Sequence, residues 1–185
     1  MSEFYCMKDE TRVAGPWSDK DVPAFIPKHF RNIELRDWQK TLKDLLLKDL
    51  KDPWSRKIRF IVDPIGGHGK SVFARYMKYY HKAITLPSTL VTAEGVMQCM
   101  CAKMGKSHDA RVVIVDFPRA TAKSHWHVFA RALETIKDGC AYDKRYSWTE
   151  VDFDTPAILC LCNAPPPSGV FSADRWEEFH LPISV

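Results

Sequence analysis

Apolar and polar residues follow one another along the chain with two different periods, which predict helices and strands. From residue 34 to residue 50, apolar side chains recur at helical spacing, and Asp52 and Pro53 follow the last of them. After that, short continuous apolar runs of strand length alternate with segments of helical period. Helices are therefore expected at 34–50, 70–81, 89–104 and 124–137. Strands are expected at 58–62, 84–86, 112–115 and 157–162, with two shorter strands at 140–142 and 147–153.

Strands that alternate with helices predict an α/β fold, in which helices cover both faces of a parallel sheet. The helix at 34–50 precedes this core. It is expected to pack on the core, and contact with a neighbouring subunit is the alternative role. The first 32 residues include several prolines and show no clear period, so they are expected to form a linker. The expected organisation is thus a linker at 1–32, a helical segment at 33–55 and the α/β core at 56–185.

The composition limits the kind of protein. With 185 residues the chain is long enough for one domain with a sizeable core. The net charge of +4 suits a protein that meets phosphates, although an ordinary surface would carry it too. No apolar run approaches the length of a membrane span and no signal peptide opens the chain, so we expect an intracellular protein that is not secreted and has no membrane partner. The six cysteines are expected to be reduced thiols rather than zinc ligands.

The segment between the strand at 58–62 and the helix at 70–81 has the composition of a phosphate-binding loop. It reads Pro64-Ile65-Gly66-Gly67-His68-Gly69-Lys70-Ser71, with Pro64 where the motif usually has its first glycine. Glycines let consecutive backbone N–H groups wrap a phosphate, and the helix N-terminus faces the same anion. Lys70 is expected to reach the β- and γ-phosphates of ATP, and the Ser71 hydroxyl to bind Mg²⁺. The residues expected to bind the nucleotide are Pro64, Gly66, Gly67, His68, Gly69, Lys70 and Ser71.

Two polar residues follow apolar strands and are expected at the same edge of the sheet as the loop. Asp116 comes after the run 112–115, and Asn163 comes after the run 157–162. Ligands of open α/β sheets bind at the carboxyl ends of the strands, so both side chains should face Lys70. Asp116 is expected to be the acidic residue that holds Mg²⁺ together with Ser71. Asn163 could hydrogen-bond the γ-phosphate or the attacking water, and a turn-forming asparagine before prolines is the equal alternative.

The order of several motifs resembles one protein family. After the phosphate loop come Asp-Phe-Pro-Arg at 116–119, Lys-Asp-Gly at 137–139, a basic hairpin, a strand ending in Asn163, and Ser-x-Asp-Arg-Trp at 172–176. This order resembles the helicase part of the replication initiators (Rep proteins) of circular single-stranded DNA viruses. The likeness is strongest to the nanovirus and alphasatellite kind, and it runs from about Tyr5 to Trp176. It implies a P-loop NTPase of AAA+-like fold, with a parallel sheet flanked by helices and a small helical segment ahead of it, in helicase superfamily 3.

The resemblance also implies roles in ATP hydrolysis. The catalytic residues carried over from the family are Lys70, Asp116 as the Walker B acid, Asn163 as sensor 1 and Arg175 as the arginine finger. Arg175 would reach the ATP held by the next subunit of a ring. The alternative for Arg175 is a surface arginine paired with Asp174, and Arg119 and Arg131 are rival candidates for the finger.

Residues 143–146 read Asp-Lys-Arg-Tyr and are expected to form a hairpin turn. In the resembled family the corresponding loop grips single-stranded DNA in the central channel. Lys144 and Arg145 could pair with phosphates, and Tyr146 could stack on bases. A solvated hairpin tip is the alternative.

The first residues resemble the end of the endonuclease domain of such a Rep protein. Tyr5-Cys6-Met7-Lys8 has the letters of its last motif, in which the tyrosine nicks DNA. The metal-binding histidines that stand upstream in the family do not precede it here. His125 and His127 lie downstream in a helix, where a spacing of two does not share a face. We therefore expect a fragment of a longer protein with no nicking activity.

The expected function is that of an ATP-dependent DNA helicase module of a viral rolling-circle replication initiator. The resemblance implies ATP and Mg²⁺ as cofactors and single-stranded DNA as partner. It also implies a homo-oligomeric ring (a hexamer first), host replication proteins as further partners, and the host nucleus as location. Asp116 lacks a second acid beside it, because its neighbours are Val115 and Phe117. A nucleotide-binding assembly or DNA-binding module with little hydrolysis is therefore the alternative.

Overall fold

The computed structural model describes residues 25–119, 121–145 and 148–181. The chain forms two units, Met1–Ile33 and Glu34–Val185. In the first unit the described residues include a 3-10 helix, η3 (Lys28–Phe30), after which Arg31 Nε donates a hydrogen bond to the Ile26 carbonyl. Most of the expected linker, including the motif around Tyr5, lies outside the described residues.

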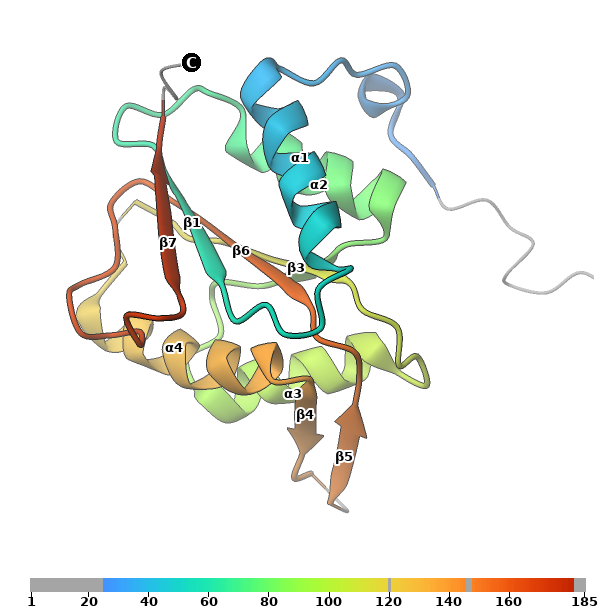
Figure 1. Cartoon of the computed structure of the whole chain (residues 1–185), viewed down its shortest axis with the longest axis vertical. Helices are drawn as coiled ribbons and strands as arrows, with labels where there is room; N and C mark the ends of the chain where they lie inside the picture. The colour runs from blue at the N-terminus through green and yellow to red at the C-terminus, as the bar shows by residue number, and fades with distance from the viewer. Residues whose placement is uncertain (1–24, 120, 146–147, 182–185) are drawn as a thin grey trace, which may run out of the picture. The chain divides into compact units, whose positions relative to one another are not determined.

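The second unit contains a five-stranded sheet in which all strands run parallel (Figure 1). Its strand order is β2-β3-β6-β1-β7. The strands are β1 (Ile58–Val62), β2 (Ile84–Leu86), β3 (Val112–Asp116), β6 (Ala157–Cys162) and β7 (Trp176–His180). The expected α/β fold is confirmed, and the arrangement is consistent with a P-loop NTPase.

Helices cover both faces of this sheet (Figure 1). They are α1 (Asp37–Asp49), α2 (Lys70–His81), α3 (Ala93–Met104) and α4 (Lys123–Lys137). Side chains alternate across each strand, so Ile61 of β1 packs with α1 and α2, whereas Phe60 packs with α3 and α4. The buried strands carry apolar residues on both faces, which explains why they read as continuous apolar runs in the sequence.

Strand β7 was not expected from the sequence. Its five residues, Trp176–His180, include two glutamates and a histidine and are mostly half-buried. The strand lies at the edge of the sheet and pairs with β1, so one side of its backbone is unpaired within the sheet. Arg59 of β1 pairs with Glu177 of β7 at 2.8 Å and also with Asp49 at the end of α1. The polar residues of β7 are therefore typical of an edge strand, which does not need a continuous apolar run.

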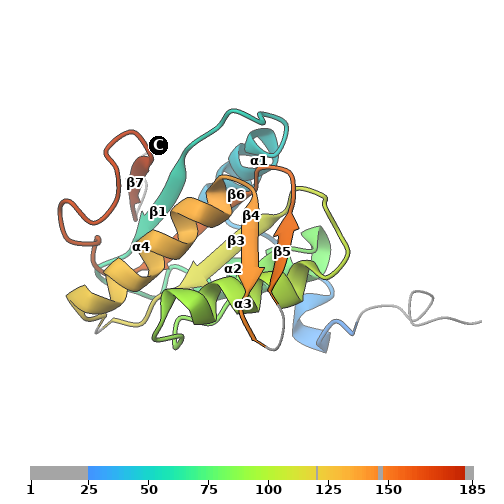
Figure 2. The ribbon, with the colours of Figure 1, turned by 90° about the horizontal axis from the view of Figure 1, so that it is seen from below.

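The hairpin expected around residues 143–146 is present. Strands β4 (Cys140–Asp143) and β5 (Thr149–Asp152) pair antiparallel as a separate two-stranded sheet (Figure 2). Ala141 and Phe153 bury this hairpin against the core on the α3–α4 side. Tyr146, one of the residues expected to bind DNA, lies outside the described residues.

Five of the cysteines lie in the described part of the chain, and all five are free thiols. Cys101, Cys160 and Cys162 are buried, and burial raises the pKa of each thiol, that of Cys162 to about 12. These three cysteines therefore act as small apolar core residues at neutral pH.

Candidate functional site

The loop between β1 and α2 has the backbone conformation that a phosphate-binding loop needs. Gly66, Gly67 and Gly69 have φ angles of +87°, +81° and +88°, a region that favours glycine. Helix α2 begins at Lys70, directly after the last of these glycines. The N-terminal end of α2 therefore opens toward the loop, and its free backbone N–H groups favour a bound anion.

The loop forms one side of a cavity of about 350 Å³, which we call the phosphate cradle. It is lined by Asp63, Gly66, Gly67, Gly69, Lys70, Ser71, Val72, Asp116, Arg119 and Asn163. The sheet order explains this gathering, because β6 lies between β1 and β3. The loop after β1, Asn163 after β6 and Asp116 at the end of β3 thus meet at one edge. The structure brings together most of the residues that the sequence singles out for nucleotide binding.

Ser71 and Asp116 form the oxygen-rich part of the cradle. Ser71 Oγ donates a hydrogen bond to Asp116 Oδ2 at 2.5 Å, although the two residues are 45 positions apart. A hydroxyl and a carboxylate side by side are the hard oxygen ligands that Mg²⁺ prefers. The donor set of this pair therefore fits a magnesium ion.

Asp63 is the central residue of the cradle that sequence reasoning missed. Its carboxylate is fully buried and accepts hydrogen bonds from Lys70 Nζ at 2.9 Å and from the Gly66 N–H at 2.7 Å. His68 Nδ1 lies 2.9 Å from the same carboxylate. Asp63 follows the apolar run of β1 directly, as Asp116 ends β3 and Asn163 follows β6. That shared position was the signal that could have identified it.

The contacts of Asp63 keep it ionised. Burial alone would raise the pKa of this carboxyl, but the hydrogen bonds from Lys70, Gly66 and His68 outweigh burial and lower the pKa to about 2. A carboxylate with such a low pKa is a weak base. Asp63 therefore suits a structural role that holds the loop and Lys70 rather than proton abstraction.

Asn163 lies at the cradle and is tied to β1. Its Nδ2 donates to the Asp63 carbonyl at 2.7 Å, and Asn163 lines the cavity beside Lys70 and Asp116. This contact fixes the orientation of the Asn163 side chain at the edge of the cavity. The sensor role stays a prediction.

The three candidate arginines lie in different places. Arg119 lines the cradle, and its guanidinium donates to the Ile65 carbonyl at 3.0 Å. Arg175 precedes β7 at the opposite, amino-terminal end of the sheet. Arg131 is an exposed residue of α4 that lines another surface hollow.

Arg175 is buried and engaged within its own chain. It is 8% exposed, and its guanidinium donates to the Glu134 carbonyl at 2.9 Å and to the Asp138 carboxylate at 2.8 and 3.1 Å. The alternative of a surface arginine paired with Asp174 is wrong, because Arg175 is buried and Asp174 pairs with Arg56. The finger role of Arg175 in a neighbouring subunit stays a prediction.

Helix α1 supports the phosphate loop, a role that its sequence did not reveal. Gln39, which is 2% exposed, donates from Nε2 to the Gly69 carbonyl at 3.0 Å and accepts the Arg36 N–H at 2.9 Å through Oε1. Arg36 also donates from its guanidinium to the Gly67 carbonyl at 3.4 Å. The start of α1 thus holds two of the loop's carbonyl groups and turns them away from the anion site.

The two described residues expected to bind DNA, Lys144 and Arg145, are not part of the cradle. Lys144 and Arg145 lie on the β4–β5 hairpin, which packs on the α3–α4 side of the sheet. Both residues are exposed, and Arg145 forms a bidentate ion pair with Asp143. The hairpin is therefore a second region, separate from the phosphate cradle.

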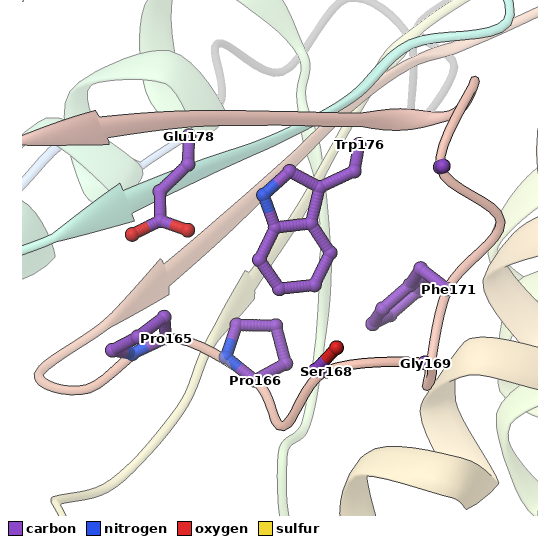
Figure 3. A pocket seen from close by; sticks show the side chains of 8 residues that line it. Pro165, Pro166, Ser168, Gly169, Phe171, Trp176 and Glu178 are labelled. Atoms are coloured by element: carbon purple, nitrogen blue, oxygen red, sulfur yellow. The ribbon is translucent and has the colours of Figure 1, made fainter.

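A second hollow, of about 380 Å³, lies beside the edge strand β7 (Figure 3). Trp176 and Glu178 of β7 point toward the loop that carries Pro165 and Pro166, and Phe171 closes one side. Among the described residues, Glu178 is the one charged member of its lining. The lining offers no cation for a phosphate, so the candidate nucleotide site is the cradle.

Comparison with known proteins gives a distant but extensive match. No family model matches the chain. The Para-Rep C1 protein of Faba bean necrotic yellows C1 alphasatellite is 26% identical in a 179-residue alignment that covers 77% of this chain. The chain is a distant homologue of alphasatellite Para-Rep proteins. It spans 59% of the length of the C1 relative.

Other relatives match nearly the whole chain. The Para-Rep C7 protein of Faba bean necrotic yellows C7 alphasatellite is 24% identical over 92% of this chain and 70% of its own length. The Para-Rep C3 protein of Milk vetch dwarf C3 alphasatellite is 21% identical over 97% of this chain and 72% of its own length. The homology to Rep-like proteins thus agrees with the resemblance noted in the sequence, while the helicase activity is a separate question. Among the described residues, no helix has the length and apolar character of a membrane span.

Proposed function

We propose that this chain is an ATPase module of a viral replication initiator, which hydrolyses ATP to move along single-stranded DNA. The observation that carries the proposal is the phosphate cradle. A glycine loop with positive φ angles, a lysine, a serine–aspartate pair, an asparagine and an arginine meet there at the carboxyl edge of a parallel sheet. This set supplies the positive charge and the oxygen ligands that a nucleoside triphosphate needs.

The chain's own groups have distinct tasks in nucleotide binding. The N–H groups of the loop and of the first turn of α2 donate to the β-phosphate, and the Lys70 ammonium reaches the β- and γ-phosphate oxygens. Ser71 and Asp116 are the residues that would hold Mg²⁺, which shields the negative charge of the phosphates when it is bound. The Asp63 carboxylate holds Lys70 until the nucleotide arrives.

Hydrolysis in this cradle depends on positioning rather than on a strong base. Its lining contains two carboxylates among the described residues, Asp63 and Asp116, and Asp63 has a pKa lowered to about 2. The Asn163 amide can orient the attacking water in line with the γ-phosphate, and Arg119 can neutralise charge on the phosphoryl oxygens. Turnover is therefore expected to be slow.

Assembly and DNA contact belong to the same proposal. The homology to Para-Rep proteins supports a role in DNA replication, and exposed cations on the β4–β5 hairpin give a place for the strand. We propose a homo-oligomeric ring, a hexamer in its simplest form, that works in the nucleus of the infected host cell. In such a ring the hairpins of successive subunits would follow one strand.

Steady-state ATP hydrolysis with and without single-stranded DNA tests the proposal. The chain should hydrolyse ATP, and single-stranded DNA should increase the rate. Lys70→Ala should abolish turnover, because the β- and γ-phosphates lose their cation. Lys78→Ala is the matched control, since Lys78 is an exposed lysine on the same helix and its loss should leave turnover unchanged. Equal rates for both variants would refute the ATPase assignment.

A nucleotide-binding assembly module with little hydrolysis is the second candidate. The observation that favours it is the surroundings of Asp116, where the flanking Val115 and Phe117 are buried apolar residues. No second acid thus stands beside Asp116 to polarise water. This candidate would be favoured if the chain assembles with ATP in a Lys70-dependent way and shows no ATP turnover.

A further inference from the structure

The β4–β5 hairpin carries two stacked aromatic rings that the proposed ATPase chemistry does not use. Tyr142 of β4 and Trp148, the residue before β5, have ring centroids 5.4 Å apart and planes within 11° of parallel. The indole Nε1–H donates to Glu150 Oε2 at 3.4 Å. These two contacts hold the indole ring in one orientation.

Trp148 remains open to solvent in spite of these contacts. It is 62% exposed, which is unusual for a tryptophan in a folded chain. Tyr142 covers one face of the indole, so much of the exposed area belongs to the other face and the ring edge. An ordered ring with an open face can accept a flat ligand without losing much conformational freedom.

The charges next to the ring pair favour an anionic ligand. The Lys144 ammonium lies 5.3 Å from the centre of the Tyr142 ring. Arg145 is held by Asp143 through contacts of 2.7 to 3.2 Å, whereas Lys144 lies against the Tyr142 ring. A flat π-surface beside an ammonium group matches a nucleotide unit, which has a flat base and a charged phosphate.

We propose that Trp148, backed by Tyr142, is a stacking platform for an unpaired nucleobase of a single-stranded nucleic acid. Lys144 then pairs with a phosphate next to the stacked base. This inference rests on the proposed DNA-binding function and adds the residue that contacts the base. Stacking recognises any base, because every base has a π-face, and this suits a strand that moves past the protein.

Binding of fluorescent oligonucleotides, measured by anisotropy, tests the platform. The ligands are an oligothymidylate of about 20 nucleotides, an oligouridylate of the same length, and an abasic strand with the same number of phosphates. Trp148→Leu should weaken thymidylate binding roughly 5- to 100-fold, the effect of losing one base stack, and leave abasic binding unchanged. Trp148→Phe should recover part of the loss. Trp54→Leu is the matched control, since Trp54 is 87% exposed and is not part of the hairpin.

The outcomes separate this inference from the proposed function. If the unchanged chain binds thymidylate and Trp148→Leu binds it equally well, the platform is refuted and the ATPase proposal stands. If the unchanged chain binds neither oligonucleotide, both the platform and the DNA-binding function fail. A loss of affinity in Trp148→Leu supports the platform. Comparing that loss for thymidylate with the loss for uridylate shows whether the platform prefers DNA or RNA.

Discussion

Lys70 Nζ lies 2.9 Å from Asp63 Oδ2, in an ion pair that is almost completely shielded from solvent. The lysine expected to bind the triphosphate is therefore held by a carboxylate of its own loop. The Gly66 N–H, a donor expected to face the phosphates, is also held by Asp63. Under the proposed function, a nucleotide would have to compete with Asp63 for these donors.

Removing the charge of Asp63 should strengthen nucleotide binding. Asp63→Asn keeps an oxygen acceptor for Gly66 but no longer competes for the Lys70 ammonium or repels the phosphates. We expect a several-fold lower Kd for ADP, measured by calorimetric titration. Asp37→Asn is the control, because Asp37 forms a solvent-exposed pair with Lys40 on α1. Weaker ADP binding in Asp63→Asn would show instead that the carboxylate is needed to order the loop.

The same ion pair should make stability depend on acid pH. The pKa of Asp63 is lowered from 3.8 to about 2 in the folded chain, so folding favours the ionised form. Its stabilisation is complete above about pH 4 and is lost as the pH falls toward 2. Over that range the unchanged chain should lose about 2 kcal/mol more unfolding free energy than Asp63→Asn. Urea unfolding at several pH values measures the difference, and parallel curves for the two proteins would contradict the prediction.

The sequence predicted those parts of the site that follow from local pattern. The glycine loop after β1 and the polar residues at the ends of β3 and β6 could be placed because parallel strands end at one edge, whereas Asp63 at the end of β1 was missed. The role of Gln39 could not be predicted, because its contact with Gly69 joins residues 30 positions apart and depends on how α1 packs. Strand β7 was missed because its two adjacent glutamates and its histidine suit an edge strand rather than an apolar run.

Gln39 should act as a positioning residue for the phosphate loop. Gln39→Leu fills the buried space but removes the hydrogen bond to the Gly69 carbonyl and the cap of Arg36. We expect a KM for ATP several-fold higher, with a smaller change in kcat, because the loop binds substrate while the hydrolytic groups lie elsewhere. Lys40→Ala, an exposed change one residue away, is the control. An equal fall in kcat with unchanged KM would place Gln39 in the chemical step instead.

Arg175 should contribute to stability whether or not it acts as a finger. Its guanidinium satisfies the Glu134 carbonyl at the end of α4 and pairs with Asp138, so Arg175→Ala should cost about 1–3 kcal/mol. Urea unfolding tests this cost. A finger that acts between subunits has a second signature. Mixing Arg175→Ala chains with Lys70→Ala chains should restore part of the ATPase activity, and mixtures that remain inactive would argue against the finger.

Arg119 should be the arginine on which hydrolysis within one subunit depends most. It lines the phosphate cradle and is oriented by the Ile65 carbonyl, so its charge is close to the expected γ-phosphate. Arg119→Ala should lower kcat by roughly 10²-fold or more, because the developing charge on the phosphoryl oxygens loses its neutralising group. The KM for ATP should change less, since Lys70 and the loop still hold the substrate.

Arg131→Ala supplies the matched comparison, because Arg131 was the other rival and lies on the exposed surface of α4. Its loss should leave kcat unchanged. Free guanidinium added to Arg119→Ala should restore part of the rate if the missing charge is the cause, whereas it should not affect the unchanged chain. A normal kcat in Arg119→Ala would show that Arg119 does not contribute to hydrolysis. Arg175 of a neighbouring subunit would then be the candidate for the finger.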